Sequence, residues 1–298
     1  MKKKYSFRFV DVFTDSAFSG NQLAVFEKPK NLTKKQMQNI AREINFSETT
    51  FVYPSKRKEI DAKVRIFTPY SEIPFAGHPV IGTAFVLAEK FNKRRKKKAQ
   101  RVFLEIESGV VELDVAYHGK NPPTITMHQP VPKFGVALMD RGQAAKAVGI
   151  ERESVIGGGV VSNGLDFLIV ELDSEDSVKR ARLNIDQAAR VIERYHVSGI
   201  YIFSRKEGSR IDLHSRFFAP TLGVQEDPAT GSASGAVGGY LSRIFKFPAK
   251  LEIRILQGAE IGRPSKIDVT VLCERGVVSA VSVTGTVVPA GEGYLIVP

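Results

Sequence analysis

Three side chains beside two glycine-opened segments are the residues of this sequence that could do chemistry. Glu226 and Asp227 lie just before Gly231, which opens a run of small and apolar residues, and His78 directly follows Gly77, which opens another. Carboxylate and imidazole groups take and return protons near neutral pH. The backbone N–H groups at a helix start have no partner inside the helix and attract anions. This combination predicts proton transfer on an anionic substrate.

Another carboxylate, Glu48, lies between the apolar residues Phe46 and Phe51, at the start of a predicted strand. Apolar surroundings disfavour the charged form of a carboxyl group and raise its pKa. We therefore expect Glu48 to exchange protons near neutral pH. Spacing alone leaves structural roles open for all these residues, because Asp227 could cap the helix that follows it and His78 could be a hydrogen-bonded helix-start residue.

The two helix starts belong to a repeat. Arg65–Pro69 reads Arg-x-Phe-x-Pro and precedes Gly77, and Arg216–Pro220 has the same pattern and precedes Gly231. The spacing is 151 residues at the arginines and 154 at the glycines, so the second connection is three residues longer. A repeat at half the chain length indicates duplication. The sequence therefore predicts two similar lobes, each with one helix opened by glycine.

The elements that must position these residues are mostly strands. Period-2 alternation predicts many strands and 3.6-residue periodicity only a few helices, which indicates an α+β fold and not alternating βαβ units. The last fifth of the chain contains strands only, predicted over 251–256, 266–273, 277–283, 286–288 and 294–297. Proline and glycine at 119–123 and 129–132 mark the domain link. We expect an N-terminal lobe over 1–120, with 286–298 as a candidate to complete it, and a C-terminal lobe over 121–285.

Composition limits the class of protein. The 298 residues are 43% apolar and 25% charged, which is typical of a globular chain long enough for two domains. No apolar run approaches the roughly 18 residues of a membrane span, and the N-terminal stretch alternates like a strand and not like a secretory signal. The single cysteine, Cys273, excludes an internal disulfide. We expect a cytoplasmic protein.

The net charge of +11 is concentrated in two places. Lys93–Lys98 supplies six positive charges and Lys2–Lys4 three more, which leaves +2 over the remainder. Lys93–Lys98 lies between a predicted helix and a predicted strand without interleaved aromatic residues, so we interpret it as a solvated connection. A phosphate-binding or nucleic-acid patch stays open as the alternative. No Walker loop and no histidine pair with zinc-helix spacing occurs, so neither nucleotide nor metal cofactor is expected.

Several motifs together resemble the phenazine-biosynthesis isomerase (PhzF-like) family, of the diaminopimelate epimerase-like fold. They cover almost the whole chain and comprise Val10–Phe13, Ser19–Asn21, Asn45–Phe51, Phe67–Pro69, Glu72–Pro74, Ala76–Pro79, Phe218–Pro220, Glu226–Ala233 and Gln257–Pro264. The resemblance implies two pseudo-symmetric lobes, each a curved, mostly antiparallel sheet around a central helix, with the site in the cleft between them. It also implies a homodimer and chemistry without a cofactor.

At the matching positions, the resemblance implies that Glu48 moves a proton between carbons of a small carboxylate substrate. Asp227 and His78 would flank the substrate, and the helix starts at Gly77 and at Gly231 with Ser232 would bind its carboxylate. No cysteine stands at the places where racemases of this fold carry two thiols, so two-thiol racemisation is not expected. A ligand-binding or protein-interaction member of the fold without catalysis is the alternative. The substrate and the role of Gln257–Pro264 stay open, with a structural role favoured for the latter.

Overall fold

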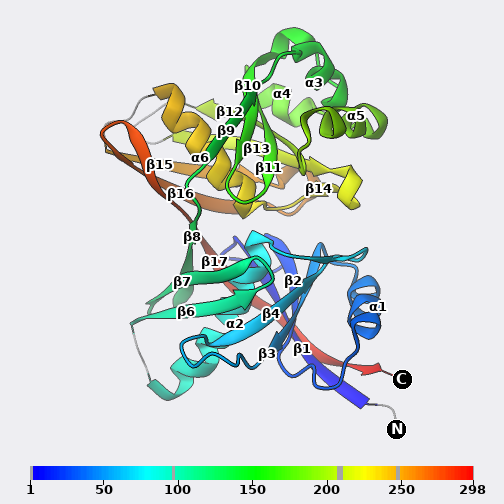
Figure 1. Ribbon diagram of the computed structural model, residues 1–298, viewed down its shortest axis with the longest axis vertical. Helices are drawn as coiled ribbons and strands as arrows, with labels where there is room; N and C mark the ends of the chain where they lie inside the picture. Colours follow the sequence, from blue (N-terminus) through cyan, green and yellow to red (C-terminus); the bar gives the residue numbers. More distant parts are fainter. Residues whose placement is uncertain (1–2, 96–97, 207–210, 246–248, 298) are drawn as a thin grey trace. The chain divides into compact units, whose positions relative to one another are not determined.

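The computed structural model describes residues 3–95, 98–206, 211–245 and 249–297. The chain divides into two compact units, the first formed by Met1–His128 with Thr284–Pro298 and the second by Gln129–Val283. We call them unit 1 and unit 2. In Figure 1, unit 1 carries both ends of the chain. Lys3 there pairs with Val297, so the first and last described residues lie side by side.

Unit 1 contains most of the first half of the chain and the last strand. Its elements are β1 (Lys3–Val12), β2 (Asn21–Phe26), α1 (Lys34–Ile44), β3 (Glu48–Tyr53), β4 (Ala62–Phe67), β5 (Glu72–Ile73), α2 (Gly77–Arg95), β6 (Ala99–Ile106), β7 (Gly109–His118), β8 (Asn121–Gln129) and the second part of β17 (Val277–Val297). β1 pairs antiparallel with β17 and with β2, and β2 pairs parallel with β3. β4 continues the sheet antiparallel to β3, and β8 pairs with β7 and also with β17.

Helices cover both faces of the β1–β4 part of this sheet. α2 packs against β1, β2, β3, β6 and β7, and it approaches the sheet closely at Gly82, where a Cβ would lie 2.6 Å from the side chain of Leu23. α1 packs on the opposite face through Met37, Ile40 and Ala41, against a cluster of aromatic side chains. A capping box of Thr33 and Gln36 starts α1. Successive side chains of β2 and β3 point to opposite faces of the sheet, so these strands contribute to one apolar layer under α1 and to another under α2.

Unit 2 is built in a similar way. Its elements are β9 (Lys133–Ala137), α3 (Arg141–Val148), η1 (Arg152–Ser154), β10 (Val155–Ser162), β11 (Asp166–Leu172), α4 (Glu175–Arg180), α5 (Ile185–Tyr195), β12 (Gly199–Lys206), β13 (Ile211–Ala219), η2 (Pro220–Leu222), β14 (Val224–Asp227), α6 (Gly231–Phe245), β15 (Lys250–Gln257), η3 (Ala259–Ile261), β16 (Ser265–Glu274) and the first part of β17. β11 and β12 pair in parallel, β12 and β13 antiparallel, and β13 and β15 in parallel.

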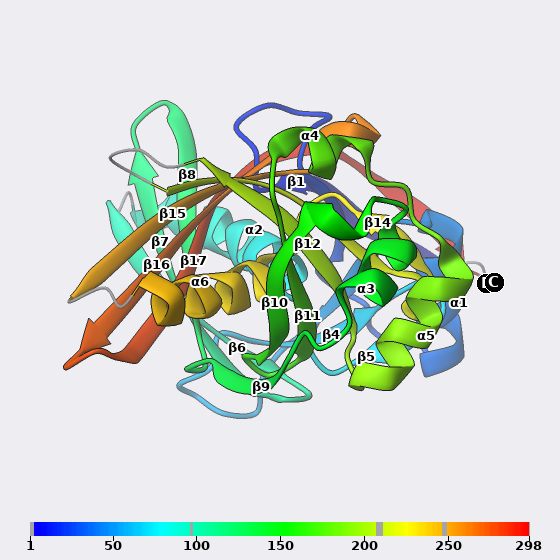
Figure 2. The ribbon, with the colours of Figure 1, turned by 90° about the horizontal axis from the view of Figure 1, so that it is seen from above.

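The sheet of unit 2 also has helices on two faces. α3, α4 and α5 share one apolar cluster with alternate residues of β10, β11 and β12, such as Leu168, Val170 and Ile202. α6 packs against β10, β11, β15 and β16 (Figure 2). Ring contacts such as the one between Phe203 and Tyr240 join α6 to the other face of the strands. The buried helix α6, rich in glycine, serine and alanine, thus lies directly on the sheet.

The predicted sheet-dominated α+β class is confirmed, and the last part of the chain differs from expectation. Three strands were predicted between 277 and 297, but β17 is one strand of 21 residues. A glycine such as Gly285 is often found where a strand ends, but here the strand continues through it. Gly285 leaves room for the ring of Phe13, because a Cβ at this position would lie only 2.2 Å from a ring carbon. Pro289 pairs with Val10 at a register shift, where the ladder is already irregular and tolerates a missing N–H donor.

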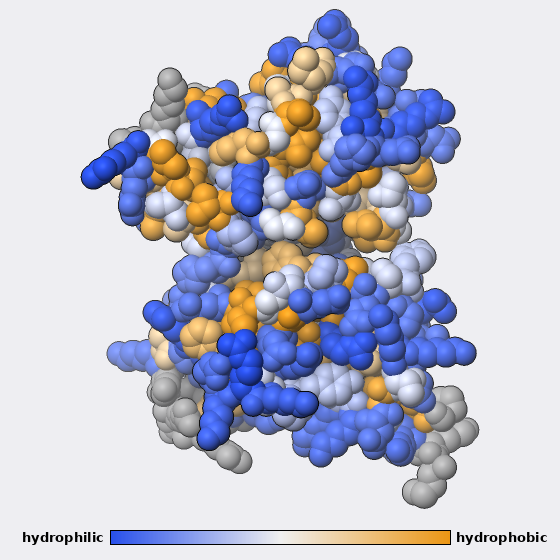
Figure 3. Space-filling model, viewed as in Figure 1, coloured by the Kyte–Doolittle hydropathy of each residue, from blue (hydrophilic) through white to orange (hydrophobic). Residues whose placement is uncertain are grey.

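On the face drawn in Figure 3, hydrophilic side chains cover most of each unit, with smaller apolar patches among them. Lys93–Arg95 belongs to α2, so the prediction of a connecting loop over the basic run is wrong for these three residues. Residues 96 and 97 lie outside the described residues. Among the described residues, we find no helix with the length and apolar character needed to cross a membrane.

Candidate active site

Three polar side chains meet in unit 1. Asn21 is the first residue of β2, Glu48 the first of β3 and His78 the second of α2. Nε2 of His78 lies 3.3 Å from Oε2 of Glu48, and Nδ2 of Asn21 lies 3.1 Å from Nδ1 of His78. The parallel pairing of Leu23 with Glu48 places the starts of β2 and β3 side by side. These residues form the Asn21–His78–Glu48 cluster.

His78 is a neutral member of this cluster. Its side chain is 4% exposed, and burial lowers its pKa to about 3, with a hydrogen bond to the backbone of Gln22 acting in the opposite direction. A neutral imidazole offers one donor and one acceptor. It therefore contacts the Glu48 carboxylate without the positive charge that would favour the ionised form of that carboxylate.

The connection that leads into α2 is held in place before the helix begins at Gly77. The Thr68 hydroxyl accepts two backbone hydrogen bonds, of 3.1 and 3.0 Å, within the turn that follows it. Arg65 binds Glu72 through two hydrogen bonds of 2.6 and 2.8 Å. Those bonds are the main reason that the pKa of Glu72 falls to about 2. These hydrogen bonds fix the loop before the helix and pair the charge of Glu72 with that of Arg65. Gly77, where the helix begins, is buried.

Asp227 in unit 2 is the centre of a second polar cluster. It is the last residue of β14 and is 8% exposed. The hydroxyl of Thr230 donates to Oδ2 of Asp227 at 2.6 Å. Gln257, at the end of β15, donates from Nε2 to the backbone oxygen of Asp227 at 2.8 Å and to Oγ1 of Thr230 at 3.0 Å. We call these three residues the Asp227–Thr230–Gln257 cluster.

The start of α6 directly follows this cluster and is also buried. Gln129 donates to the carbonyl of Gly231 at 3.0 Å, and Asn163 donates to the carbonyl of Ser232 at 2.7 Å. Asn163 also donates to Gln129 at 2.6 Å. Two amide side chains thus fix the backbone of the first turn. The N–H groups at the helix start keep the geometry and partial positive charge that favour an anion.

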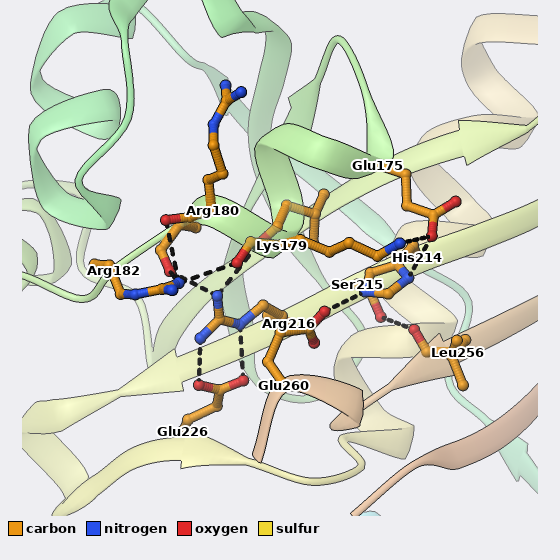
Figure 4. Close-up of polar contacts among 12 residues, drawn as sticks. Glu175, Lys179, Arg180, Arg182, His214, Ser215, Arg216, Glu226, Leu256 and Glu260 are labelled. Atoms are coloured by element: carbon orange, nitrogen blue, oxygen red, sulfur yellow. Dashed lines mark hydrogen bonds and ion pairs between the residues drawn. The ribbon is translucent and has the colours of Figure 1, made fainter. Parts of the chain in front are cut away.

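Glu226, next to Asp227, has a structural partner. Arg216 binds it through two hydrogen bonds of 2.8 and 2.6 Å, and Nη1 of Arg216 also donates to the carbonyls of Val178 and Ala181 (Figure 4). The pair Arg65–Glu72 has the same place in the first repeat, where Glu72 lies five residues before Gly77 as Glu226 lies five residues before Gly231. Glu226 therefore ties β14 to β13, and Asp227 is the carboxylate of this loop that can act as an acid or base.

The two repeats differ at the position of Glu48. The repeated residue Phe67 pairs with Thr49, and its counterpart Phe218 pairs with Ile200. Glu48 and Gly199, each one residue before these partners, therefore occupy equivalent positions of the two repeats. A Cβ at Gly199 would lie 2.4 Å from a ring carbon of Phe217. Packing thus leaves no room for a side chain there, and unit 1 alone carries a carboxylate at this position of the repeat.

The predicted site residues fall into two groups. Glu48 and His78 contact each other in unit 1, and Gly77 lies next to His78 in the chain. Asp227, Gly231 and Ser232 lie within six residues in unit 2, at the end of β14 and the start of α6. Their proposed roles stay predictions.

Sequence reasoning assigned no role to three further members of these clusters. In the sequence, Asn21 and Thr230 are members of the family motifs Ser19–Asn21 and Glu226–Ala233, and Gln257 begins a motif without an assigned role. Membership of those motifs was the available signal, because the hydrogen bonds that join them to His78 and Asp227 span up to 57 residues of sequence. Among the described residues, no group of three or more histidine, cysteine, aspartate or glutamate side chains is arranged to hold a metal ion.

Comparison with known proteins identifies relatives of the whole chain. A family model described as phenazine biosynthesis-like protein matches residues 10–293. The trans-2,3-dihydro-3-hydroxyanthranilate isomerase of Pseudomonas fluorescens is 34% identical over 292 residues, which cover 98% of this chain and 99% of the relative.

Solved structures agree with this result. The crystal structure of a PhzF-family phenazine biosynthesis protein from Bacillus anthracis superposes with a TM-score of 0.88 at 25% identity, over 99% of this chain and 100% of the other. A hydroxyproline epimerase from Agrobacterium vitis shares the fold, with a TM-score of 0.65 at 15% identity over 100% of this chain and 94% of the other.

Proposed function

The chain is an isomerase that belongs to the phenazine biosynthesis-like (PhzF) family, and on this premise we propose that Glu48 moves a carbon-bound proton on a small carboxylate substrate without a cofactor. The observation that carries the proposal is the contact between the Glu48 carboxylate, whose side chain is 13% exposed, and the neutral ring of His78. A base that must release its proton again in each turnover works best when no fixed cation holds it ionised.

The proposed reaction balances without an oxidant or a reductant. Glu48 takes the proton from one carbon, and the electron pair of that C–H bond passes into the adjoining unsaturated system as an enolate-like charge. The proton then returns to another carbon, directly from Glu48 or through Asp227, and the double bond ends in a new position. A positioned general base contributes about 10²–10⁴-fold to such a step. The remaining acceleration must come from stabilising the charge on the intermediate.

The neutral state of His78 supports this cycle. The ring nitrogens of His78 lie within contact distance of Glu48 and Asn21. Since the ring carries no charge, it can hold the side chain of Glu48 in place in both protonation states of the carboxyl group. His78 and Asn21 thus act as positioning residues for Glu48 in this proposal.

Binding of the substrate carboxylate is assigned to the helix starts at Gly77 and at Gly231 with Ser232. Support comes from the connections that precede them, which are fixed by the pairs Arg65–Glu72 and Arg216–Glu226. Preorganised N–H donors stabilise developing charge because they need no reorganisation during the reaction. Asp227, held by Thr230 directly before the second helix start, is the proposed second acid or base.

The name of the Pseudomonas fluorescens relative suggests the first compound to test. Its substrate is a six-membered-ring amino acid with a carboxylate and ring unsaturation, which fits the proposed chemistry. We propose that this chain acts on a compound of that class, an unsaturated carboxylate of similar size.

The test is isomerisation in D₂O followed by proton NMR. trans-2,3-Dihydro-3-hydroxyanthranilate and a panel of small unsaturated and α-amino carboxylates are incubated with the wild type, with Glu48→Gln and with Glu59→Gln, an exposed carboxylate that serves as the matched control. We expect deuterium at a carbon position with the wild type and the control, and a loss of at least about 10²-fold with Glu48→Gln. Full activity of Glu48→Gln would contradict the role of Glu48. Tight binding of carboxylates without exchange by the wild type would favour the binding-protein alternative.

A further inference from the structure

A fully buried amide side chain holds the loop of Asp227. Gln257 has no exposed surface, and each of its polar groups is used on this loop. Its Nε2 donates to the Asp227 carbonyl at 2.8 Å and to the Thr230 hydroxyl at 3.0 Å, while its Oε1 accepts from the backbone N–H of Thr230 at 3.3 Å. The carbonyl can only accept and the N–H can only donate, so these partners fix the orientation of the amide.

The same contacts fix the direction of the Thr230 hydroxyl. A hydroxyl has one proton and two acceptor sites, and the Nε2 group of Gln257 can only donate. The Thr230 oxygen therefore accepts from Gln257, and its single proton is left for Oδ2 of Asp227, 2.6 Å away. A hydrogen bond donated to a carboxylate stabilises the ionised form of that carboxylate.

The segment that follows Gln257 is anchored on two sides. A Cβ at Gly258 would lie 2.6 Å from the carbonyl oxygen of Pro228 and 2.5 Å from that of Arg263, so this backbone packs directly on the Asp227 loop. Glu260 accepts a 2.7 Å hydrogen bond from Nε2 of His214 on β13, among the contacts drawn in Figure 4. Gln257 is therefore a rigid support for the loop.

We propose that Gln257 is a positioning residue for Asp227, acting through Thr230: its amide aims the Thr230 proton at the Asp227 carboxylate and holds the Asp227 backbone. The catalytic meaning of this role rests on the proposed function, in which Asp227 takes part in proton transfer. This arrangement assigns a role to the Gln257–Pro264 motif. It makes Asp227 a weaker base and a more readily ionised acid than the same carboxyl group without the hydroxyl.

Other charged groups lie on the elements next to the Asp227 loop. They are Arg216 on β13, Glu226 on β14, and Glu260 and Arg263 after β15. None of them is altered in the variants below, so a change in the Asp227 pKa reports on the hydroxyl. Loss of a hydrogen bond to a charged group raises the pKa of a carboxyl by about one to two pH units.

The experiment is a ¹³C NMR titration of the aspartate carboxyl groups in the full-length protein, with the Asp227 signal assigned from Asp227→Asn. Four variants are compared with the wild type. Thr230→Val removes the hydroxyl and keeps the shape, Thr230→Ser keeps the hydroxyl, and Gln257→Met removes the amide at similar length. Ser242→Ala, which removes another buried hydrogen bond of unit 2, is the control for general destabilisation.

We expect the Asp227 pKa to rise by about one to two pH units in Thr230→Val, to rise in Gln257→Met, and to stay near the wild-type value in Thr230→Ser and Ser242→Ala. A further variant that combines Thr230→Val with Gln257→Met should shift the Asp227 pKa no further than Thr230→Val alone, because Gln257 acts through Thr230. An unchanged pKa in Thr230→Val overturns the proposal, even if the Gln257 variant does not fold. The titration needs no substrate, so it can succeed while the D₂O experiment fails. In that case the proposed function falls and the positioning role stands.

Discussion

The environment of Glu48 comes from residues far away in the sequence. Its sequence neighbour Phe51 suggested an apolar setting, but Phe51 lies three residues further along the strand and packs in the core beneath α1. Alternation along a strand sends such residues to opposite faces. The partner of Glu48 is His78, 30 residues away, whose presence near the site was predicted from the family motif. Its neutral state follows from burial, which no local pattern reveals.

Burial of neutral His78 makes the stability of the protein depend on pH. The folded-state pKa of about 3 lies below the ordinary value of 6.5, so between these values the unfolded chain binds a proton that the folded chain does not. Stability then falls as pH decreases below about 6.5, by up to about 1.4 kcal/mol per pH unit from this residue. We expect urea denaturation at pH 7 and pH 4.5 to show a smaller acid-induced loss for His78→Gln than for the wild type. His118→Gln, at an exposed site, should behave like the wild type, and equal losses in all three proteins would refute the assignment.

At the scale of elements, helices and strands could be predicted well because their caps and periodicities are local. Gly77 and Gly231 open the two helices as predicted, and Asn45 and Asp140 cap α1 and α3 through residue types that are typical of caps. The connections that fix these helices were not predictable. The Arg216–Glu226 pair depends on the register of β13 and β14, and the sequence shows only that a carboxylate precedes Asp227.

The close packing of Gly258 on the Asp227 loop predicts a sensitive position with a matched control. Gly258 and Gly276 have nearly the same backbone conformation, φ +77° and +79°, but a Cβ at Gly276 would meet no atom within 4 Å. Alanine at either site costs about 1–2 kcal/mol of backbone strain. We expect Gly258→Ala to lose more stability in urea denaturation than Gly276→Ala and also to reduce deuterium exchange. Equal effects of the two substitutions would show that the contact with Pro228 is unimportant.

The buried Arg216–Glu226 pair predicts a large effect of removing one partner. Arg216→Met leaves the Glu226 carboxylate buried without its main partner, which typically costs about 3–5 kcal/mol. Arg254→Met breaks the exposed pair with Asp268 and should cost at most about 1 kcal/mol. Urea denaturation of both variants at pH 7 measures this difference. A similar small loss in both would mean that Arg216 does not fix the loop before α6.

At the scale of the whole molecule, the sequence alone reveals the duplication. The difference between the two repeats at the position of Glu48 becomes visible only from the strand register. The repeat places Gly199 where unit 1 has Glu48, and the spacing of the motifs does not reveal this because β12 contains no motif. The homodimer predicted from the family resemblance stays a prediction, which light scattering of the purified protein will test.

If the residues of both units serve one reaction, their substitutions will not combine independently. We expect Glu48→Gln and Asp227→Asn each to lower the rate of deuterium exchange by at least about 10²-fold. The double variant should be only slightly slower than the slower single variant, because groups that act as a unit are strongly non-additive. Fully multiplicative losses would indicate that Asp227 acts outside the step that Glu48 performs.

The path of β17 reverses the order in which the two units can be completed during synthesis. Residues 284–297 belong to unit 1 and contain the strand segment 287–297 that pairs with β1, but the ribosome makes them after all of unit 2. Domains generally fold in N-to-C order. Unit 1 cannot be completed in that order, because β1 lacks its neighbour β17 until residues 287–297 have been synthesised. A released chain truncated after Val283 should therefore resist limited proteolysis within the described residues of 129–283 and be cleaved within the described residues of 3–128.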